Sequence, residues 1–154
     1  MRVLIFSDSH GQKETMLKAF HAENEPGAVY HLGDGAAEFK ALSADFGKAI
    51  LLGHKGNCDS GDCGFPTESL RELCGVKLFA CHGHTQHVKS GLIELMFSAM
   101  ERNAKICLYG HTHIPDVTYH NGIWFVNPGA AMIGRYAVIE LGEDGSIYPK
   151  LQSL

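Results

Sequence analysis

The stretch Val3-Leu4-Ile5-Phe6-Ser7-Asp8-Ser9-His10 contains the pattern that decides the fold of this chain. Four apolar residues are followed at once by a polar segment with a carboxylate and an imidazole. A short apolar run that ends in polar turn residues is typical of a buried β-strand that stops at a loop. Other apolar runs end in the same way farther along the chain. They lead into Gly33-Asp34, Gly56-Asn57-Cys58-Asp59, His82-Gly83-His84 and Gly110-His111-Thr112-His113.

The side chains at these strand ends indicate a metal centre. Open α/β sheets place their sites at the carboxyl ends of the strands, so we expect these loops to meet there. Unpaired polar groups are costly to desolvate, which makes such a gathering unsuitable for an ordinary core. The candidate metal ligands, all of them carboxylates, imidazoles or amides, are Asp8, His10, Asp34, Asn57, His82, His111 and His113.

Two pairs of candidates are separated by a single residue. In an extended segment, side chains two residues apart point the same way. On that basis we expect Asp8 and His10 to reach one cation together, and His111 and His113 have the same spacing. Either pair alone is better explained by buried histidines with ordinary hydrogen bonds, so the argument depends on the whole set.

The types of donor atom narrow the choice of metal. Oxygen and imidazole ligands without an obligatory thiolate suit Mn²⁺, Fe or Zn²⁺. The set of candidates is larger than one such ion accepts, so we expect two ions that share a bridging carboxylate. Two metals roughly 3.5–4 Å apart are a standard arrangement for the cleavage of phosphate esters.

Composition limits the classes of protein to which the chain can belong. With 154 residues, 45% of them hydrophobic, we expect one globular domain over residues 1–154. The net charge of −4 argues against a protein that grips a nucleic-acid backbone, although bound divalent ions would reverse the local sign. No signal peptide and no membrane span are expected. Five cysteines, an odd number, are typical of free thiols in a reducing cytoplasm.

The apolar pattern predicts an α/β fold. Residues 2–52 alternate between strand and helix, as parallel strands with crossover helices do. The rest is mostly antiparallel β-structure around one further helix. The expected strands are 2–6, 28–32, 48–52, 68–73, 76–81, 105–109, 117–120, 123–126, 135–141 and 146–151, and the expected helices are 12–23, 36–45 and 91–103. The last helix is expected to bury a stripe formed by Leu92, Ile93, Met96, Phe97 and Met100. Together these elements predict two packed mixed β-sheets flanked by helices.

The ordered motifs carry a resemblance. Asp-x-His, Gly-Asp, Gly-Asn-Cys-Asp, His-Gly-His and Gly-His-Thr-His, in this order, resemble those of the calcineurin-like metallophosphoesterases. The Gly-Asn-Cys-Asp variant, the small size and the trailing Asn127-Pro128-Gly129 are similar to the compact microbial phosphodiesterases of the YfcE type. The likeness extends from Asp8 to Gly129. It implies the four-layer sandwich of that superfamily, with helices outside two sheets.

The resemblance also implies a role for each candidate ligand. Asp8, His10 and His113 would hold the first metal, and Asn57, His82 and His111 the second, while Asp34 would bridge. The implied cofactors are two divalent ions, Mn²⁺ before Fe, Zn²⁺ or Ni²⁺. The implied reaction is hydrolysis of a small phosphodiester or phosphomonoester by a hydroxide that bridges the metals.

Three neighbouring residues are further catalytic candidates. Cys58 stands where the wider superfamily often has a histidine thought to protonate the leaving group, and a thiol suits that role poorly. His84 is the candidate helper, although a role as a loop residue that forms ordinary hydrogen bonds explains it equally well. Asp59 is expected to brace the loop or a ligand, or to form a turn. Asn127-Pro128-Gly129 is expected to be a tight turn, with a supporting role near the metals as the alternative.

Two rival functions remain open at this point. One is a non-catalytic or weakly catalytic protein-binding scaffold, as in the retromer subunit that this fold resembles. The other is a nuclease, against which the net charge and the absence of an added DNA-binding segment both argue. Association into a homo-oligomer stays open, and no membrane partner is expected.

Overall fold

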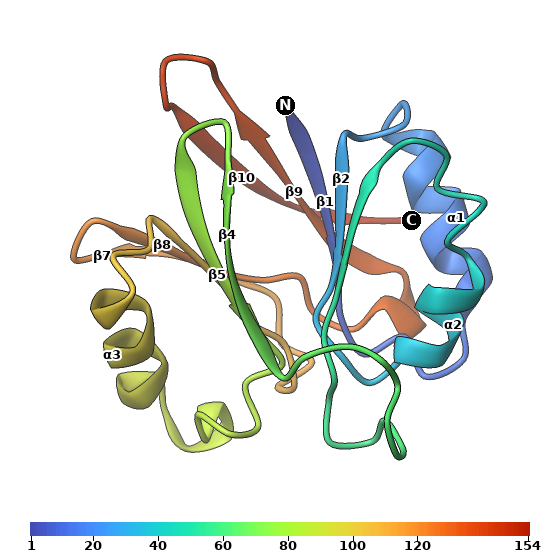
Figure 1. Cartoon of the computed structure of the whole chain (residues 1–154), viewed down its shortest axis with the longest axis horizontal. Helices are drawn as coiled ribbons and strands as arrows, with labels where there is room; N and C mark the ends of the chain where they lie inside the picture. The colour runs from blue at the N-terminus through green and yellow to red at the C-terminus, as the bar shows by residue number, and fades with distance from the viewer.

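Two five-stranded sheets form the centre of the computed structural model, which describes all 154 residues. The first sheet has the order β10-β9-β1-β2-β3 and the second the order β4-β5-β6-β8-β7 (Figure 1). The strands of the first sheet are β1 (Arg2–Phe6), β2 (Ala28–His31), β3 (Ile50–Gly53), β9 (Arg135–Leu141) and β10 (Ile147–Ser153). Those of the second are β4 (Glu68–Leu73), β5 (Val76–Cys81), β6 (Ile106–Leu108), β7 (Asp116–His120) and β8 (Ile123–Asn127).

Each sheet has a parallel section, and this section positions the polar loops. β1, β2 and β3 run parallel, with β9 antiparallel to β1. In the second sheet β5, β6 and β8 run parallel, with β4 and β7 antiparallel at the edges. Because parallel strands end at the same edge of a sheet, the loops that follow them lie together.

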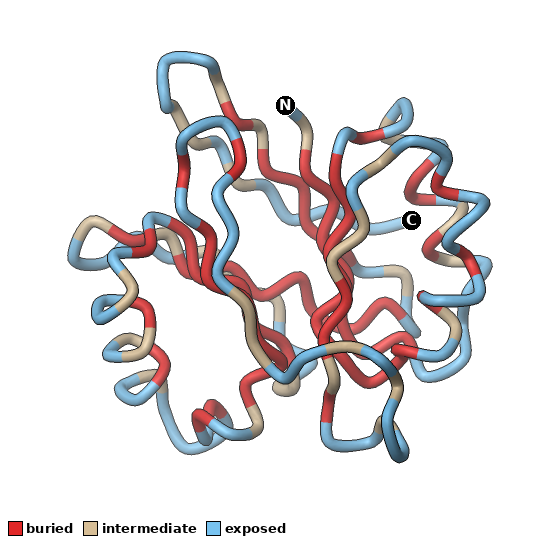
Figure 2. The backbone as a smooth tube through the Cα atoms, viewed as in Figure 1, coloured by how far each residue is buried: buried red, intermediate tan, exposed pale blue.

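Alternation along the strands divides the apolar side chains between two layers. Val3 and Ile5 of β1 belong to a buried cluster of 15 residues drawn from both sheets. Leu4 and Phe6, which point the other way, pack with Met16 and Phe20 of a helix. Figure 2 shows the buried positions concentrated along the strands, with the exposed ones in loops and on the outer faces of helices.

The helices lie outside the sheets. α1 (Lys13–Ala22) and α2 (Ala36–Ala41) contribute buried residues to the cluster on the outer face of the first sheet. α3 (Ile93–Glu101) covers the second sheet on the opposite side of the molecule (Figure 1). Two short 3₁₀ helices, η1 (Val88–Ser90) and η2 (Ala131–Ile133), complete the elements. The predicted fold class, two packed mixed sheets flanked by helices, is confirmed.

Two details of the sequence prediction are wrong. The second helix ends at Ala41, not at residue 45, and turns follow it. The buried side of α3 is formed by Leu95 and Ala99, with Leu92 and Met96 partly buried. Ile93, Phe97 and Met100 are exposed, by 67%, 56% and 42%. The helix has apolar side chains on nearly all of its sides. The position of the sheet, and not the sequence pattern, therefore determines which side is buried.

No helix in the structure has both the length and the apolar character needed to cross a membrane. All five cysteines are free, as expected, and Cys81 and Cys107 are buried core residues.

Candidate metal centre

Loops from both sheets bring the predicted ligands to one place. Asp8 follows β1, Asp34 follows β2 and Asn57 follows β3, all in the first sheet. His82 comes directly after β5, and the segment with His111 and His113 follows β6. The two sheets are joined here by hydrogen bonds, because the amide of His111 donates to the Asp8 carboxylate and Nδ1 of His82 donates to the carbonyl of Leu32.

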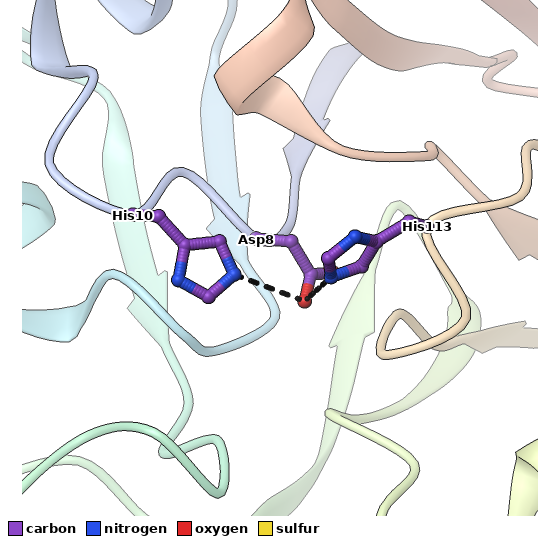
Figure 3. Close-up of side chains that lie close together, drawn as sticks. All are labelled: Asp8, His10 and His113. Carbon is purple, nitrogen blue, oxygen red and sulfur yellow. Dashed lines mark ion pairs between the residues drawn. The ribbon is translucent and has the colours of Figure 1, made fainter.

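One group of ligands surrounds the Asp8 carboxylate. Oδ1 of Asp8 lies 3.0 Å from Nε2 of His113 and 4.0 Å from Nε2 of His10. Figure 3 shows the two rings on opposite sides of this oxygen. Oδ2 accepts hydrogen bonds from the Ser7 hydroxyl at 2.5 Å and from the His111 amide at 3.1 Å. Oδ1 itself is buried and has no hydrogen-bond partner. A buried carboxylate oxygen left in this way is costly unless a cation binds to it.

A second group surrounds the ring of His82. Its Nδ1 lies 2.9 Å from the carbonyl oxygen of Leu32 and donates to it. In a neutral ring with this tautomer, Nε2 keeps a lone pair and cannot donate. Nε2 nevertheless lies 3.1 Å from Oδ1 of Asn57 and 3.4 Å from Oδ2 of Asp34, and 3.2 Å from Nδ1 of His111. Electron-pair donors that converge without a proton between them form the complement of a cation.

Asp34 lies between the two groups. The donor atoms form three sets, and within each set all the atoms lie within 4.8 Å of one another. The sets are Asp8, His10 and His113; His10, Asp34 and Cys58; and Asp34, His82 and His111. Because Asp34 shares one set with His10 and another with His82, its carboxylate can reach cations on both sides. The residues present therefore fit a pair of divalent cations, with Asp34 in the position of a bridge.

The electrostatics of the site suit metal ligands. Burial works against the ionisation of Asp34, but the nearby His82 ring and the hydrogen bond from the Cys58 amide outweigh it and hold the pKa of this carboxyl well below its usual value. Burial, together with the nearby His82, lowers the pKa values of His84 and His111. Metals bind deprotonated carboxylates and neutral imidazoles, so the shifts at Asp34 and His111 favour the forms that ligands need.

The backbone at the ligands differs from the extended segment that the spacing suggested. Asp8, His10, Asp34, His111 and His113 all have positive φ, from 42° to 67°. Asp8 and His10 therefore come together through left-handed turns, and not because residues two apart share one side of a strand, whereas His111 and His113 belong to different donor sets. Tight packing of the loops demands glycine nearby, since a Cβ on Gly33 (φ 110°) would lie 2.6 Å from the Gly56 nitrogen and 2.9 Å from Nδ1 of His82.

Asp59 acts on the backbone of these loops. Its Oδ2 accepts hydrogen bonds from the amides of Asp34 and Gly56, both at 2.8 Å. Its Oδ1 accepts from Gly35 at 3.0 Å and Ala36 at 2.9 Å. Both carboxylate oxygens are thus occupied by the loops that carry Asp34 and Asn57. This geometry makes Asp59 a brace for the loop that carries Asp34, and it leaves no oxygen for a reacting group.

Asn127 has a similar supporting position, which the sequence offered only as the alternative to a tight turn. Its Nδ2 donates to the carbonyl of Gly110 at 3.2 Å and to Oγ1 of Thr112 at 3.0 Å, while its Oδ1 accepts from Gly129 at 2.9 Å. Asn127 is fully buried and so fixes the loop that carries His111 and His113. The tight turn was expected, but the brace depends on a contact between distant segments. The one available signal was an amide at the end of a buried strand.

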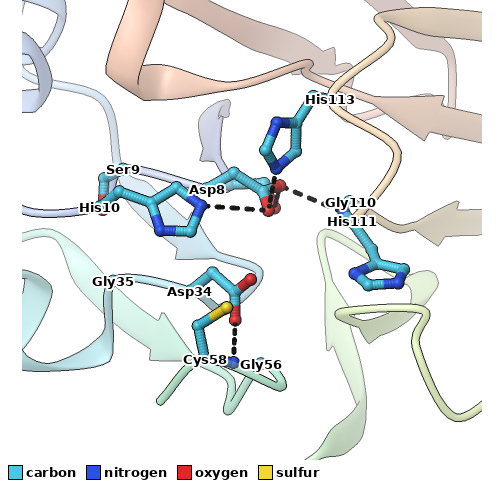
Figure 4. A network of polar contacts seen from close by, with 12 residues as sticks. Asp8, Ser9, His10, Asp34, Gly35, Gly56, Cys58, Gly110, His111 and His113 are labelled. Atoms are coloured by element: carbon cyan, nitrogen blue, oxygen red, sulfur yellow. Dashed lines mark hydrogen bonds and ion pairs between the residues drawn. The ribbon is translucent and has the colours of Figure 1, made fainter.

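The two remaining candidates lie on different sides of the centre. The ring of His84 is 5.3 Å from that of His82 and 6.2 Å from that of His111, measured between centroids, and its Nδ1 is buried without a partner. Cys58 is exposed, and its amide donates to Oδ1 of Asp34 at 2.8 Å. Figure 4 shows its sulfur beside the Asp34 carboxylate. A hydrogen bond to Asp34, more than burial, raises the pKa of this thiol.

Comparison with known protein families identifies the class. The model of the calcineurin-like phosphoesterase superfamily domain matches residues 1–142, and the chain belongs to this superfamily. The probable metallophosphoesterase YsnB of Bacillus subtilis is 32% identical over 154 residues, which cover 95% of this chain and 88% of YsnB.

Solved structures agree on the fold. An archaeal phosphodiesterase superposes with a TM-score of 0.78 at 21% identity, over 99% of this chain and all of that one. Vps29 of Entamoeba histolytica, solved in complex with Zn²⁺, has a TM-score of 0.76 at 19% identity, over 99% of each chain. At these identities the likeness shows the fold alone.

Proposed function

We propose that this metallophosphoesterase is a dinuclear phosphodiesterase that hydrolyses small phosphate esters. The observation that carries the proposal is the buried and unpartnered Oδ1 of Asp8, which faces imidazole nitrogens of His10, His82 and His113 at 3.0 to 4.0 Å. A purely structural cluster would be expected to satisfy this oxygen with a donor.

Each ligand has a place in the proposal. Asp8, His10 and His113 would hold one cation, Asn57, His82 and His111 the other, and Asp34 would bind both. When bound, such a pair lowers the pKa of water and stabilises the charge that develops on a phosphoryl group. Two divalent ions set against the carboxylates of Asp8 and Asp34 leave roughly +2 at the centre, so an anionic ester is attracted despite the net charge of −4.

Other residues of the chain would position the ligands and the ester and would donate a proton. The hydroxyl of Ser7 and the His111 amide fix the Asp8 carboxylate so that one oxygen points into the centre. A hollow of about 270 Å³ beside it, lined in part by His10, Glu38 and Cys58, offers room for part of a small ester. We propose that His84 donates the proton to the leaving group, because its ring borders those of His82 and His111.

Mn²⁺ is the proposed native metal, and a reducing cytoplasm the proposed location.

Hydrolysis of an activated diester tests this function. Bis-p-nitrophenyl phosphate should be cleaved by the protein with Mn²⁺, cleavage should stop with a chelator, and added Mn²⁺ should restore it. Asp34→Asn should lower metal content and activity together, the latter by at least about a hundredfold, because the variant lacks the proposed bridge. If metal-loaded protein cleaves neither a monoester nor a diester, the proposal is wrong.

A protein-binding scaffold is the second candidate. The observation in its favour is the exposed apolar side of α3, with Ile93 and Phe97, next to an apolar hollow of about 430 Å³ that Met96, Tyr119 and Phe125 help to line. Against it, every proposed ligand position in this chain has a residue able to bind metal. A stoichiometric protein partner isolated with the chain, together with absent turnover, would favour the scaffold.

A further inference from the structure

The side chain of Cys58 lies among candidate metal ligands, and proton donation alone does not require such an environment. Its backbone amide is held 2.8 Å from Oδ1 of Asp34, which fixes the start of the side chain next to the proposed bridge. Sγ of Cys58, a ring nitrogen of His10 and a carboxylate oxygen of Asp34 all lie within 4.8 Å of one another. Figure 4 shows the sulfur and the His10 ring near the Asp34 carboxylate.

An independent observation points to a cation beside His10. The buried Oδ1 of Asp8, which has no hydrogen-bond partner, lies 4.0 Å from Nε2 of His10. His10 therefore belongs to two sets of donors, one with Asp8 and His113 and one with Asp34 and Cys58. A single cation beside His10 has oxygen, nitrogen and sulfur donors within reach.

We propose that the thiol of Cys58 is an additional ligand of the cation held by Asp8, His10 and His113. When the cation binds, the S–H bond breaks, the proton passes to solvent and the sulfur donates an electron pair to the metal. The inference rests on the metal centre of the proposed function, but not on turnover. It assigns to Cys58 the binding of metal in place of proton transfer.

A thiolate changes which metals the site prefers. Soft sulfur ligands favour Zn²⁺ and its thiophilic analogues over Mn²⁺, which prefers oxygen. The chain is thus expected to bind Cd²⁺, Zn²⁺ and Co²⁺ at this position more tightly than a site made of carboxylates and imidazoles alone. Mn²⁺ binding should depend on Cys58 only weakly.

Cobalt substitution tests the proposal directly. Sulfur bound to Co²⁺ gives a charge-transfer absorption in the near-ultraviolet, separate from the visible bands that any bound Co²⁺ shows. The full chain loaded with Co²⁺ should show this absorption. Cys58→Ser should lose it and keep the visible bands, and Cys58→His should lose it while it retains the same cobalt content. Cys63→Ser is the matched control, because Cys63 is a free thiol on the same loop that belongs to none of the donor sets.

Competition between metals provides a second readout. The ratio of Cd²⁺ to Mn²⁺ affinity, measured by equilibrium dialysis, should fall by at least about tenfold in Cys58→Ser, the lower end of the effect of losing even an outer partner of a metal ligand. The ratio should not change in Cys63→Ser.

Several results would overturn the assignment. They are a charge-transfer band that persists in Cys58→Ser, a band equally lost in Cys63→Ser, and bound Co²⁺ without any such band in the unaltered chain. Failure of the proposed function looks different, since a protein with the band but without hydrolysis of any ester would retain the thiolate ligand and lose only the enzyme.

Discussion

Oδ2 of Asp59 accepts a hydrogen bond of 2.8 Å from the backbone amide of Asp34, so one carboxylate holds the loop on which the other is displayed. The same side chain accepts from three further amides, those of Gly35, Ala36 and Gly56. Hydrogen bonds from backbone amides to an ionised carboxylate are stronger than those between neutral groups.

Asp59→Asn should destabilise the fold and weaken metal binding. An amide group in place of one oxygen would face backbone N–H groups with N–H groups of its own, at a cost of about 1–3 kcal/mol. We expect a fall in the melting temperature of about 2–10 °C, measured by circular dichroism. Turnover at saturating metal should remain within a few-fold of the unaltered protein. Asp62→Asn is the control, because Asp62 accepts only the amide of Gly64. A large loss of turnover with normal stability would instead make Asp59 a catalytic residue.

Asn127→Ala should loosen the loop of His111 and His113. It removes the donor to Gly110 and Thr112 and the acceptor for Gly129. We expect metal affinity to fall by roughly 10- to 100-fold, as when other partners of metal ligands are lost. Titration with Mn²⁺, followed by calorimetry, measures this. Thr118→Ala, on the exposed side of β7, should leave the affinity unchanged, and an equally unchanged affinity in Asn127→Ala would contradict the role of the brace.

Acid should destabilise the protein through two buried histidines. Burial lowers the pKa of His31 to about 4 and that of His54 to about 4. Both are neutral when folded but take up protons in the unfolded chain below a pH of about 6.5, so the unfolded state binds more protons between pH 6.5 and pH 4. Stability is therefore fully present above this window and falls as the pH decreases through it. Each residue should account for about 2 kcal/mol of loss between pH 7 and pH 5.

His54→Gln separates this effect from other titrations. His54 lies against Tyr30, and its ring contacts Ser69 and the carbonyl of His31. Whatever its stability at pH 7, the variant should lose about 2 kcal/mol less than the unaltered chain on going to pH 5. Urea denaturation with chelator present measures this without interference from metal release. The exposed His87 provides the control as His87→Gln. The same pH slope in all three proteins would exclude the mechanism.

The two sides of α3 should respond differently to substitution. Leu95→Ala should cost about 2–5 kcal/mol, because Leu95 is fully buried. Phe97→Ser should change stability by less than about 1 kcal/mol, since Phe97 is 56% exposed. Urea denaturation compares the two. A larger loss for Phe97→Ser than for Leu95→Ala would mean that the helix is rotated relative to the sheet.

This helix shows why the sequence predicted the fold better than the packing. The apolar runs before Asp8, Asp34 and His82 are short and end abruptly, so local pattern alone identifies strands and the loops after them. In α3, Ile93, Leu95, Met96, Phe97, Ala99 and Met100 leave almost no polar side from which to judge orientation. Only contact with β5 and β6 decides between the alternatives, and that contact involves residues distant in sequence.

The candidate ligands could be predicted from the sequence, but the contacts that brace the ligand loops could not. Asp8 and His113 have side chains whose chemistry is visible in the sequence, whatever their geometry. The brace formed by Asn127 depends on the parallel register that pairs Leu108 with Val126 and so places Asn127 beside Gly110. Nothing local encodes this register. The left-handed turns at the ligands were missed for a related reason. Aspartate and histidine in a sequence do not indicate a positive φ in the way that glycine does.

Those turns have a consequence for how the chain tolerates change. Each of Asp8, His10, Asp34, His111 and His113 adopts a conformation that costs about 1 kcal/mol or more in a residue with a side chain. Glycine would relieve this cost at every one of them and abolish the ligand. Selection for heat resistance alone would therefore favour glycine at the very positions that the chemistry requires. In a descendant that no longer carries out this chemistry, these positions should be the first to change to glycine.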